Sequence, residues 1–553
     1  MTDTMPNSLL RRVAEKDELN EINSAPLFTA GVLAHARDLS RSAHESCPED
    51  TLWEPSRESL KSGNNLDQRS NDSPERTVRE PFSQYALLAG DSETLHKTPT
   101  SDARIFYNVA APSSAFICGS QGSGKSHTLS CLLENCLISS PLLGTLPKPL
   151  TGILFHYDTF VSDTGGTPCE AAYLASNLQI KVRILCAPTN IGVMRDIYSK
   201  IDNVTVEALR LNESDLNTKR MLDLMAFVDG NRPLYMCVIE RILRDMRVAQ
   251  QETGAGFSYA TFIGLLNGET LTPDQRRPLD QRLDTLESFL VQKRSTACGR
   301  LKKEKRTGTN WCPQAGELLI IDLSCPCVTP AMACSLFNIC LSIFLEQQPP
   351  AGDDPFETQI GRFIALDEAH KYMGETAECE TLTNTLLSTI RLQRHLGARV
   401  FISTQEPTIS PKLLDLCSTT IVHRFTSPDW QRMLSNHLAG ISRGVAVART
   451  LHEMEKLHFG YSTGRNGEQR ASEGFNGITM VTEDPIQELF AHIMKLKTGE
   501  ALVFSPSSIV AWDKIVTAKG RENTVHRLLA HDVLKVVIRA RITEDGGRSI
   551  MAT

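Results

Sequence analysis

Long apolar runs are missing from this 553-residue sequence. No segment reaches the ~18 continuous apolar residues that suggest a membrane-spanning helix. The longest candidate, residues 331–345, is interrupted by two serines and an asparagine, and we expect a buried helix there. The N-terminus lacks the apolar stretch of a signal peptide, and its acidic residues argue against a transit peptide. We therefore expect an intracellular protein, nuclear or cytoplasmic, without a membrane span.

An excess of positive charge is also missing, since the formal net charge is −7. Residues 1–100 contain 17 acidic and 11 basic side chains, so the remaining residues carry a net charge of −1. A body this close to neutral has no global attraction for nucleic acid, and any such contact must come from a local patch. The one candidate patch is 293–306, with seven basic residues and one acidic residue. A solvated loop is the alternative interpretation of that run.

No pair of cysteines has the C-x2-C spacing of common zinc sites, although the chain has 15 cysteines. The cluster Cys298, Cys312, Cys325 and Cys327 is irregularly spaced, and a zinc site there is the weaker hypothesis. Most cysteines stand inside apolar runs. We interpret them as buried, reduced thiols.

Short apolar runs alternate with helical patterns from about residue 104 onward. The runs cover residues 114–120, 152–159, 181–188, 317–324, 362–368, 398–405 and 419–425. Near-continuous apolar strands separated by helices are typical of a parallel sheet covered on both faces. The sequence therefore predicts an α/β fold with a mainly parallel sheet.

Composition divides the chain further. The N-terminal hundred residues are rich in Ser, Asn, Pro, Glu and Arg, which predicts disorder, although "PFSQYALLA" (81–89) is apolar enough to dock on the body. The expected units begin with a largely disordered N-terminal segment (1–103) and a first part of the core (104–190). A helical insertion ending in a basic loop (191–312) and a second part of the core (313–440) follow. The last unit is a loop-rich C-terminal segment with closing strands (441–553).

Residues 119–126 read GSQGSGKS, which matches G-x4-G-K-[ST] between an apolar strand and a helix. Glycines let the backbone turn its N–H groups toward phosphate oxygens, and the helix adds its positive end. We expect Lys125 to reach the β- and γ-phosphates and Ser126 to bind Mg²⁺. A glycine-rich turn without a ligand is the alternative. The candidate nucleotide-binding residues are Gly119, Ser120, Gln121, Gly122, Ser123, Gly124, Lys125, Ser126 and His127.

The strand "RFIALDE" (362–368) is expected to supply the second half of the site. It delivers two carboxylates to the carboxyl edge of the sheet, where ligands of α/β proteins bind. We expect Asp367 to hold Mg²⁺ and Glu368 to orient and polarise the attacking water. The alternative is that this pair caps the following helix. Asp322 and Asp158, which end two other apolar strands, are alternative metal ligands.

Residues 367–370 spell D-E-A-H, the box of a class of RNA helicases. Those helicases also carry a Ser-Ala-Thr motif after the next strand and a Gln- and Arg-rich motif in a second motor domain, and neither is visible in this sequence. His370 then has no special role. The next apolar strand ends instead in Thr404 and Gln405. Gln405 is the candidate sensor of the γ-phosphate, and a simple strand cap is the alternative.

Three blocks together resemble the HerA/FtsK superfamily of P-loop ATPases, and the wording is closer still to fungal P-loop NTPases. The blocks are "GSQGSGKS", "FIALDEAH" and "FISTQEPTISPKLLDLCSTTIVHRF". The resemblance covers roughly residues 105–510 in blocks, without most of the 190–310 segment. It implies a hexameric ring that binds ATP and Mg²⁺ and moves DNA through a central pore. It also implies the roles given above for Lys125, Ser126, Asp367, Glu368 and Gln405.

The superfamily further implies an arginine, just before the sensor strand, that reaches the γ-phosphate of a neighbouring subunit. The segment here offers Arg391, Arg394 and Arg399, and Arg394 falls in the best position. A solvated arginine at a helix end is the alternative. Arg424 matches a second arginine of the superfamily. This sequence departs from the pattern in having no evident winged-helix domain.

The sequence as a whole predicts a Mg²⁺-dependent ATPase, a motor of the HerA/FtsK type that acts on DNA as a homo-oligomeric ring. ATP is the expected nucleotide from the resemblance alone, because no base-reading motif is visible. Two alternatives stay open. One is an ATPase that remodels protein, and the other is a slow nucleotide-dependent switch or scaffold that is not a motor.

Overall fold

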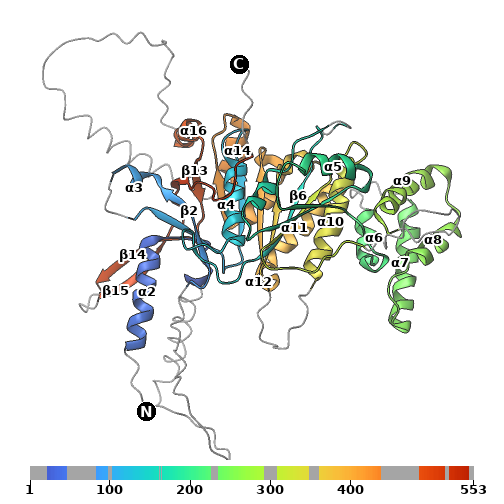
Figure 1. Cartoon of the computed structure of the whole chain (residues 1–553), viewed down its shortest axis with the longest axis horizontal. Coiled ribbons are helices and arrows are strands. Elements are labelled where there is room, and N and C mark those ends of the chain that lie inside the picture. The colour runs from blue at the N-terminus through green and yellow to red at the C-terminus, as the bar shows by residue number, and fades with distance from the viewer. Residues whose placement is uncertain are drawn as a thin grey trace, which may run out of the picture.

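A computed structural model describes ten parts of the chain: residues 22–45, 82–97, 102–160, 162, 165–225, 234–291, 308–347, 360–437, 485–516 and 522–546. Within them, a 16-stranded sheet runs through the molecule (Figure 1). Its strand order is β15-β14-β1-β3-β2-β16-β13-β12-β4-β11-β10-β6-β9-β7-β8, and β5 pairs with β2. The order divides the sheet into a parallel half, from β12 to β8, and a mainly antiparallel half, from β13 to β15.

The parallel half contains all seven strands that the apolar runs predicted, plus one edge strand. Every neighbouring pair in it is parallel. The predicted α/β fold is therefore confirmed. In spatial order the strands are β12 (Thr419–Val422), β4 (Ser114–Cys118), β11 (Ala398–Thr404), β10 (Arg362–Leu366), β6 (Thr151–His156), β9 (Glu317–Asp322), β7 (Lys181–Cys186) and β8 (Val204–Ala208).

Helices cover both faces of the parallel half. Successive side chains of a strand point to opposite faces, so each buried strand presents apolar side chains to the helices on both sides. Phe155 of β6 packs into the core on one face, and its neighbour Leu154 packs into the core on the other. The first face is covered by α10 (Pro330–Glu346), α11 (Ala377–Arg391), α13 (Pro411–Leu416), α14 (Pro428–His437) and α16 (Pro485–Lys495). The second is covered by α4 (Lys125–Leu137), α5 (Ile191–Tyr198) and the short helix η1 (Glu170–Ser176). The buried helix expected at 331–345 is thus confirmed as α10.

The antiparallel half joins segments from both ends of the chain. Its strands, in spatial order, are β13 (Glu500–Phe504), β16 (Leu534–Ile538), β2 (Tyr85–Asp91), β3 (Arg104–Asn108), β1 (Leu27–Thr29), β14 (Ile509–Val516) and β15 (Glu522–Leu528). The two-residue strand β5 (Gly144–Thr145) pairs with β2. Neighbouring pairs are antiparallel except β1 and β14.

The expectation of disorder across 1–103 is wrong for residues 22–45 and 82–97. These residues form β1, β2, α2 (Ala30–Glu45) and α3 (Ser92–Lys97). A separate small core holds them to the sheet, in which the rings of Phe28 and Phe82 stack 3.9 Å apart. The stretch 81–89 was expected to be able to dock, and its described residues join the sheet in β2. The composition hid residues 22–45, because β3 and β14, the partners of β1, lie elsewhere in the chain.

The helical insertion is shorter than the sequence suggested, because β8 still belongs to the sheet and α5 packs on one of its faces. Four helices follow, α6 (Thr218–Leu224), α7 (Leu234–Thr253), α8 (Tyr259–Asn267) and α9 (Pro273–Phe289), at the far end of the molecule (Figure 1). The basic run 293–306 lies outside the described residues. No described helix combines the length and the apolar character needed to cross a membrane.

Candidate active site

The glycine-rich loop lies between β4 and α4, as the sequence predicted. Gly119, Gly122 and Gly124 have φ angles of 154°, 70° and 110°. These left-handed conformations favour glycine, which explains the residue type at each position. Lys125 begins α4, and its Nζ donates a hydrogen bond to the carbonyl of Ser120, 3.0 Å away. The loop therefore turns around the lysine ammonium and opens onto the positive end of α4.

The end of β12 holds this loop from the side. The backbone N–H and the hydroxyl of Ser120 both donate to the carbonyl of Arg424, at 2.9 and 2.7 Å. A Cβ on Gly124 would lie 3.2 Å from the backbone nitrogen of Gly499, so the loop packs tightly against the residue that precedes β13. The seam between the two halves of the sheet thus fixes the shape of the loop.

His423, in the same seam, is a residue whose role the sequence did not reveal. Its Nε2 lies 2.9 Å from the hydroxyl of Thr128 on α4, and its Nδ1 lies 3.0 Å from the carbonyl of Glu500 on β13. The side chain is fully buried, and burial lowers the pKa of His423 to about 4. A neutral imidazole therefore ties α4 to both strands. The only sequence signal was its place in the "IVHRF" block.

The acidic pair follows β10 at the same edge of the sheet as the loop. The backbone N–H of Asp367 donates to the carbonyl of Phe155 at the end of β6, 3.1 Å away. Glu368 has φ 48° and ψ 45°, a left-handed conformation that is uncommon for a residue other than glycine. Burial lowers the pKa of Lys125, while the charges of Glu368 and Asp367 oppose that shift. The loop and the acidic pair therefore lie within electrostatic range of each other.

Gln405 and His370 both contact the carboxylate of Glu368. The side-chain amide of Gln405 donates to Glu368 Oε2 at 3.0 Å, and its backbone N–H donates to His370 Nδ1 at 3.3 Å. His370 Nδ1 also lies 3.3 Å from Glu368 Oε2. Burial lowers the pKa of His370, against the charge of Glu368. The sequence expectation that His370 has no special role is therefore wrong, because its ring lines the site.

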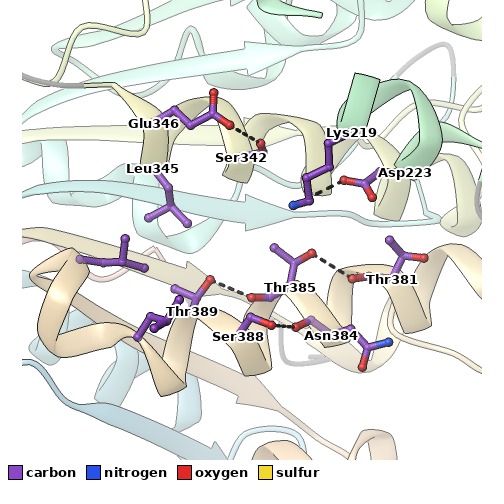
Figure 2. Close-up of a pocket in the computed structure, with 12 residues that line it drawn as sticks. Lys219, Asp223, Ser342, Leu345, Glu346, Thr381, Asn384, Thr385, Ser388 and Thr389 are labelled. Atoms are coloured by element: carbon purple, nitrogen blue, oxygen red, sulfur yellow. Dashed lines mark hydrogen bonds and ion pairs between the residues drawn. The ribbon is translucent and has the colours of Figure 1, made fainter. Parts of the chain in front are cut away.

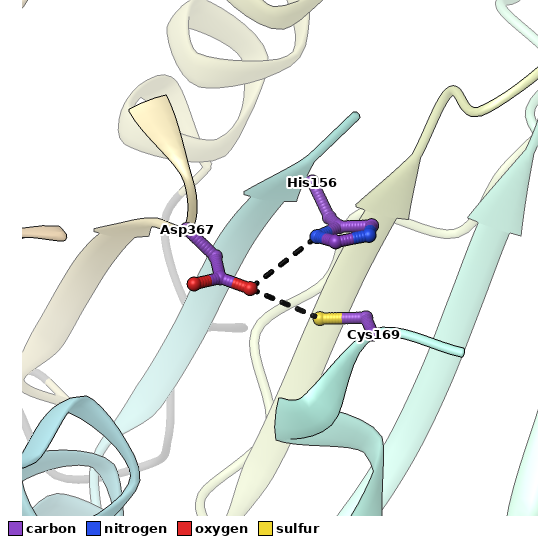
Figure 3. Close-up of side chains that lie close together, drawn as sticks. All are labelled: His156, Cys169 and Asp367. Carbon is purple, nitrogen blue, oxygen red and sulfur yellow. Dashed lines mark hydrogen bonds and ion pairs between the residues drawn. The ribbon is translucent and has the colours of Figure 1, made fainter. Parts of the chain in front are cut away.

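Asp367 lies in a buried cluster with His156 and Cys169 (Figure 3). Asp367 Oδ2 is 3.3 Å from His156 Nδ1 and 4.0 Å from Cys169 Sγ. Burial alone would lower the pKa of His156, but its contacts with Cys169 and Asp367 and the charge of Asp322 outweigh burial and raise it. The sequence carried no signal for this cluster, because three separate segments form it.

The two alternative metal ligands are already engaged. Asp322 accepts a hydrogen bond from Tyr198 Oη at 2.5 Å and another from the backbone of Ser324 at 3.0 Å. Asp158 pairs with Lys371, 3.2 Å away. Asp367, in contrast, keeps its buried Oδ1 without a hydrogen-bond partner among the described residues. This contrast favours Asp367 as the metal ligand.

Ser126 has a further carboxylate beside it. The side chain of Glu170, at the start of η1, lies near the hydroxyl of Ser126, which helps to lower its pKa, and Arg541 Nη1 lies 3.0 Å from Glu170 Oε1. Burial raises the pKa of Glu170, while the charge of Arg541 opposes the shift. Nothing in the sequence pointed to Glu170, which lies far along the chain from both motifs.

The remaining residues of the loop lie as follows. The hydroxyl of Ser123 donates to the carbonyl of Ser120 at 2.7 Å, and Gln121 is exposed. His127 Nε2 lies 2.8 Å from the carbonyl of Arg539, so its ring contacts the C-terminal segment.

The candidate arginines are not brought to this site within one chain. Arg394 is exposed on α12 (Gln393–Leu396), which precedes β11, so it lies at the amino edge of the sheet. Arg391 is exposed at the end of α11. Arg399 is buried and donates to the carbonyls of Val109 and Ala110. Arg424, in contrast, is exposed next to the glycine-rich loop, where its backbone carbonyl accepts a hydrogen bond from the hydroxyl of Ser120.

A pocket of 430 Å³ lies between α6, α10, α11 and α12 (Figure 2). Several of its hydroxyl groups, such as those of Thr385 and Thr389, donate to backbone carbonyls one turn earlier on α11. None of the residues lining it belongs to the glycine-rich loop or to the acidic pair. We therefore place the candidate site at the carboxyl edge and not in this pocket.

The strand order decides the fold. Strand β11, which ends next to Gln405, lies between β4 with its glycine-rich loop and β10 with its acidic pair. In P-loop ATPases that use a catalytic glutamate, the strand that ends at the sensor residue adjoins the strand that carries the glycine-rich loop. The protein has a P-loop ATPase fold.

No protein-family model and no curated protein matches the sequence. Among solved structures, this P-loop protein is similar to VirB4 of Thermoanaerobacter pseudethanolicus, at 10% identity and a TM-score of 0.43, over 83% of this chain and 97% of that chain. It is also similar to the genome packaging NTPase B204 from Sulfolobus turreted icosahedral virus 2, in complex with AMPPCP, at 8% identity and a TM-score of 0.25, over 75% and 98% of the two chains.

A third structure is the cytoplasmic domain of the Thermomonospora curvata Type VII secretion ATPase EccC, at 12% identity and a TM-score of 0.24, over 68% of this chain and 27% of that chain. VirB4 and the viral packaging NTPases belong to the HerA/FtsK superfamily, which the sequence motifs of this P-loop protein resemble. The similarities are distant, and the fold is assigned from the strand order and the two motifs.

Proposed function

We propose that this protein is a Mg²⁺-dependent ATPase of the HerA/FtsK type. The observation that carries the proposal is the convergence of four side chains at one edge of the sheet. Lys125 lies within electrostatic range of Asp367 and Glu368, and Gln405 is hydrogen-bonded to Glu368. The chain thus brings together a phosphate-binding cation, a metal-binding carboxylate and a water-activating carboxylate.

The donor groups at this edge fit ATP and Mg²⁺. The hydroxyl of Ser126 and the unpartnered Oδ1 of Asp367 are oxygen ligands of the kind that Mg²⁺ prefers. Mg²⁺ held by Ser126 and Asp367 would neutralise the negative charge that develops on the phosphates. Lys125 would bind phosphate oxygens as a point charge, in exchange for its present hydrogen bond to Ser120.

Glu368 is the residue that would activate water. Its carboxylate is held by the amide of Gln405, and its strained backbone fixes where the side chain begins. A carboxylate held in this way can accept a proton from water as the water attacks the γ-phosphate. Gln405 would then report the γ-phosphate by exchanging its bond to Glu368 for one to phosphate.

Completion of the site requires a second copy of the chain if Arg394 is the arginine finger. Arg394 lies at the amino edge of the sheet, whereas the loop lies at the carboxyl edge, so it can reach only the nucleotide of another subunit. We therefore propose a homo-oligomeric ring, a hexamer by resemblance, with DNA as the polymer that it moves.

The catalytic assignment is tested with Glu368→Gln. Glu375→Gln serves as the matched control, because Glu375 is an exposed glutamate seven residues after Glu368. We expect steady-state ATP hydrolysis to fall by at least about a hundredfold in Glu368→Gln, with ATP binding retained. The control should keep its turnover. Steady hydrolysis that persists in Glu368→Gln would exclude Glu368 as the residue that activates water.

The DNA assignment is tested separately. We expect duplex DNA to raise the rate of ATP hydrolysis, and we expect the stimulation to fade as salt increases, because phosphate contacts release counterions. Light scattering with and without ATP and DNA should show assembly on DNA. Hydrolysis without DNA stimulation would favour a protein-remodelling ATPase, and a constant monomer would leave Arg394 without a site to reach.

A further inference from the structure

The buried cluster of His156, Cys169 and Asp367 offers three different ligand atoms at one point (Figure 3). His156 ends β6, Cys169 immediately precedes η1, and Asp367 follows β10. One ligand atom from each residue lies within 4.8 Å of the other two. Cys169 is fully buried, and the side chains of His156 and Asp367 are 8% and 6% exposed.

The protein does not satisfy these ligand atoms by itself. Neither His156 Nδ1 nor Asp367 Oδ1 has a hydrogen-bond partner among the described residues. The 3.3 Å contact between His156 Nδ1 and Asp367 Oδ2 is an ion-pair distance without hydrogen-bond geometry. Buried polar atoms are nearly always hydrogen-bonded, so each exception needs an explanation. A cation bound in the cluster would supply the missing partner for His156 Nδ1, with Asp367 Oδ2, the oxygen that faces the cluster, as a second ligand.

The donor set selects the kind of cation. Mg²⁺ prefers oxygen ligands, whereas an imidazole nitrogen, a thiolate sulfur and a carboxylate oxygen together are typical of Zn²⁺. We propose that His156, Cys169 and Asp367 form a binding site for a thiophilic divalent cation of the Zn²⁺ type. With bonds of about 2.0–2.3 Å, tetrahedral ligand atoms lie roughly 3.3–3.8 Å apart. Small side-chain movements are therefore enough, and on binding both the thiol proton of Cys169 and the proton on Nδ1 of the charged His156 go to water.

A second layer of contacts positions the thiol. The backbone N–H of Cys169 donates to Tyr198 Oη at 3.0 Å, and Tyr198 Oη donates to Asp322 Oδ2 at 2.5 Å. The strand residue His156 pairs with Asp322 of β9, and its carbonyl accepts from the backbone of Leu323. Metal ligands commonly have such supporting partners, which hold them in place before the ion arrives.

Sharing of Asp367 gives the site a consequence for the enzyme. The same carboxylate is our proposed Mg²⁺ ligand, so Zn²⁺ bound to Oδ2 would turn the carboxylate toward the cluster and withdraw its negative charge from Mg²⁺–ATP at the loop. Zn²⁺ is thus expected to inhibit ATP hydrolysis in competition with Mg²⁺. This consequence rests on the proposed function, whereas binding of the cation does not.

Binding is tested with Co²⁺ as a spectroscopic probe on the reduced, nucleotide-free full chain. We expect absorption from thiolate-to-cobalt charge transfer in the near ultraviolet, which Zn²⁺ then displaces. Cys169→Ser should remove this absorption, and Cys136→Ser, a buried cysteine of α4 outside the cluster, should keep it. Equal absorption in wild type and Cys169→Ser, or none in wild type, would overturn the site.

A second measurement covers the case in which Cys169→Ser does not fold. Zn²⁺ affinity of His156→Gln is measured by competition with a chromophoric chelator, after circular dichroism shows a native spectrum. We expect affinity at least about tenfold weaker than in wild type, as for the loss of other metal-site contacts. Unchanged affinity in a folded His156→Gln protein contradicts the site.

Inhibition is tested in the ATPase assay, each variant being compared with its own zinc-free rate. Wild type should lose turnover as Zn²⁺ is added and regain it with excess Mg²⁺, and His156→Gln should resist the same Zn²⁺ concentrations. Equal sensitivity of the two proteins contradicts the shared ligand. A wild type without any hydrolysis would count against the proposed function, and the Co²⁺ result would still decide the cation site.

Discussion

The two halves of the sheet contribute to the candidate site in different ways. In the parallel half, reactive side chains such as Lys125 and Glu368 stand at the ends of strands or the start of a helix. The antiparallel half contacts the same region through supporting groups, among them the backbone of Gly499 and the guanidinium of Arg539. Each motif of the proposed site is a short stretch of sequence, whereas the groups that support it come from segments hundreds of residues away. Substitutions at the site in the parallel half should therefore impair ATP binding or hydrolysis, whereas substitutions of supporting groups should lower the stability of the protein.

The largest effect is expected on stability, from Arg539→Met next to the antiparallel half. Arg539 pairs with Glu134 of α4 at 2.6 Å, and the Glu134 side chain is fully buried. Removal of one partner from a buried pair leaves an uncompensated charge and costs about 3–5 kcal/mol. The free energy of unfolding from denaturant titration measures the loss.

Arg432→Met is the matched control, because Arg432 pairs with Asp429 on the surface, where both side chains are largely exposed. A pair of this kind contributes at most about 1 kcal/mol. Equal losses in the two variants would show that the buried pair does not support α4.

The next effect concerns His423 in the seam between the halves. Its pKa is lowered to about 4 in the folded protein, whereas the unfolded chain takes up the proton near the ordinary value of about 6.5. The free energy of unfolding is therefore highest above about pH 6.5, and it falls by about 3 kcal/mol as the pH drops from about 6.5 to 4. His423→Gln should flatten this part of the profile of unfolding free energy against pH.

His395→Gln, at an exposed histidine of α12, serves as the control and should keep the wild-type fall. If the profiles of wild type and His423→Gln run parallel between pH 6.5 and 4, the seam does not depend on a neutral imidazole.

Lys125→Ala tests the parallel half, where we expect weaker ATP binding and little change in stability. Loss of a charged hydrogen-bond donor to phosphate is worth about 1.5–3 kcal/mol, which corresponds to roughly 10- to 100-fold weaker ATP binding. Titration with a fluorescent ATP analogue measures the dissociation constant. Lys412→Ala, at an exposed position of α13, should bind as wild type does. If Lys125→Ala binds the ATP analogue with wild-type affinity, the glycine-rich loop is not part of the ATP-binding site.

The smallest effect is expected for Gln405→Ala. Its amide makes one hydrogen bond to Glu368, and such a bond contributes about 1 kcal/mol, or roughly a fivefold to tenfold change. We expect that change in kcat, with little change in ATP affinity, because Gln405 contacts Glu368, the residue that we propose to activate water. Gln281→Ala, exposed on α9, is the control. A change in affinity alone would make Gln405 a binding residue and not a sensor.

The parallel half could be predicted from the sequence because its information is local. Strands such as β10 are buried on both faces and therefore appear as continuous apolar runs, and the glycines of the loop carry its backbone shape. The antiparallel half could not be predicted, because its pairs are remote: Phe28 of β1 is in register with Ile509 of β14. Glu170 and Cys169 were missed for the same reason, since only the folded chain brings them to Asp367.

The contact between α4 and the C-terminal segment has a consequence for biosynthesis. Glu134 is synthesised 405 residues before its partner Arg539 and 409 residues before its partner Thr543. At about 5–20 residues per second, a ribosome needs roughly 20–80 s to cover that distance. Throughout that time the nascent helix exposes a carboxylate that it can bury only after residues 539–543 have been synthesised, so chaperones have a long window in which to bind it.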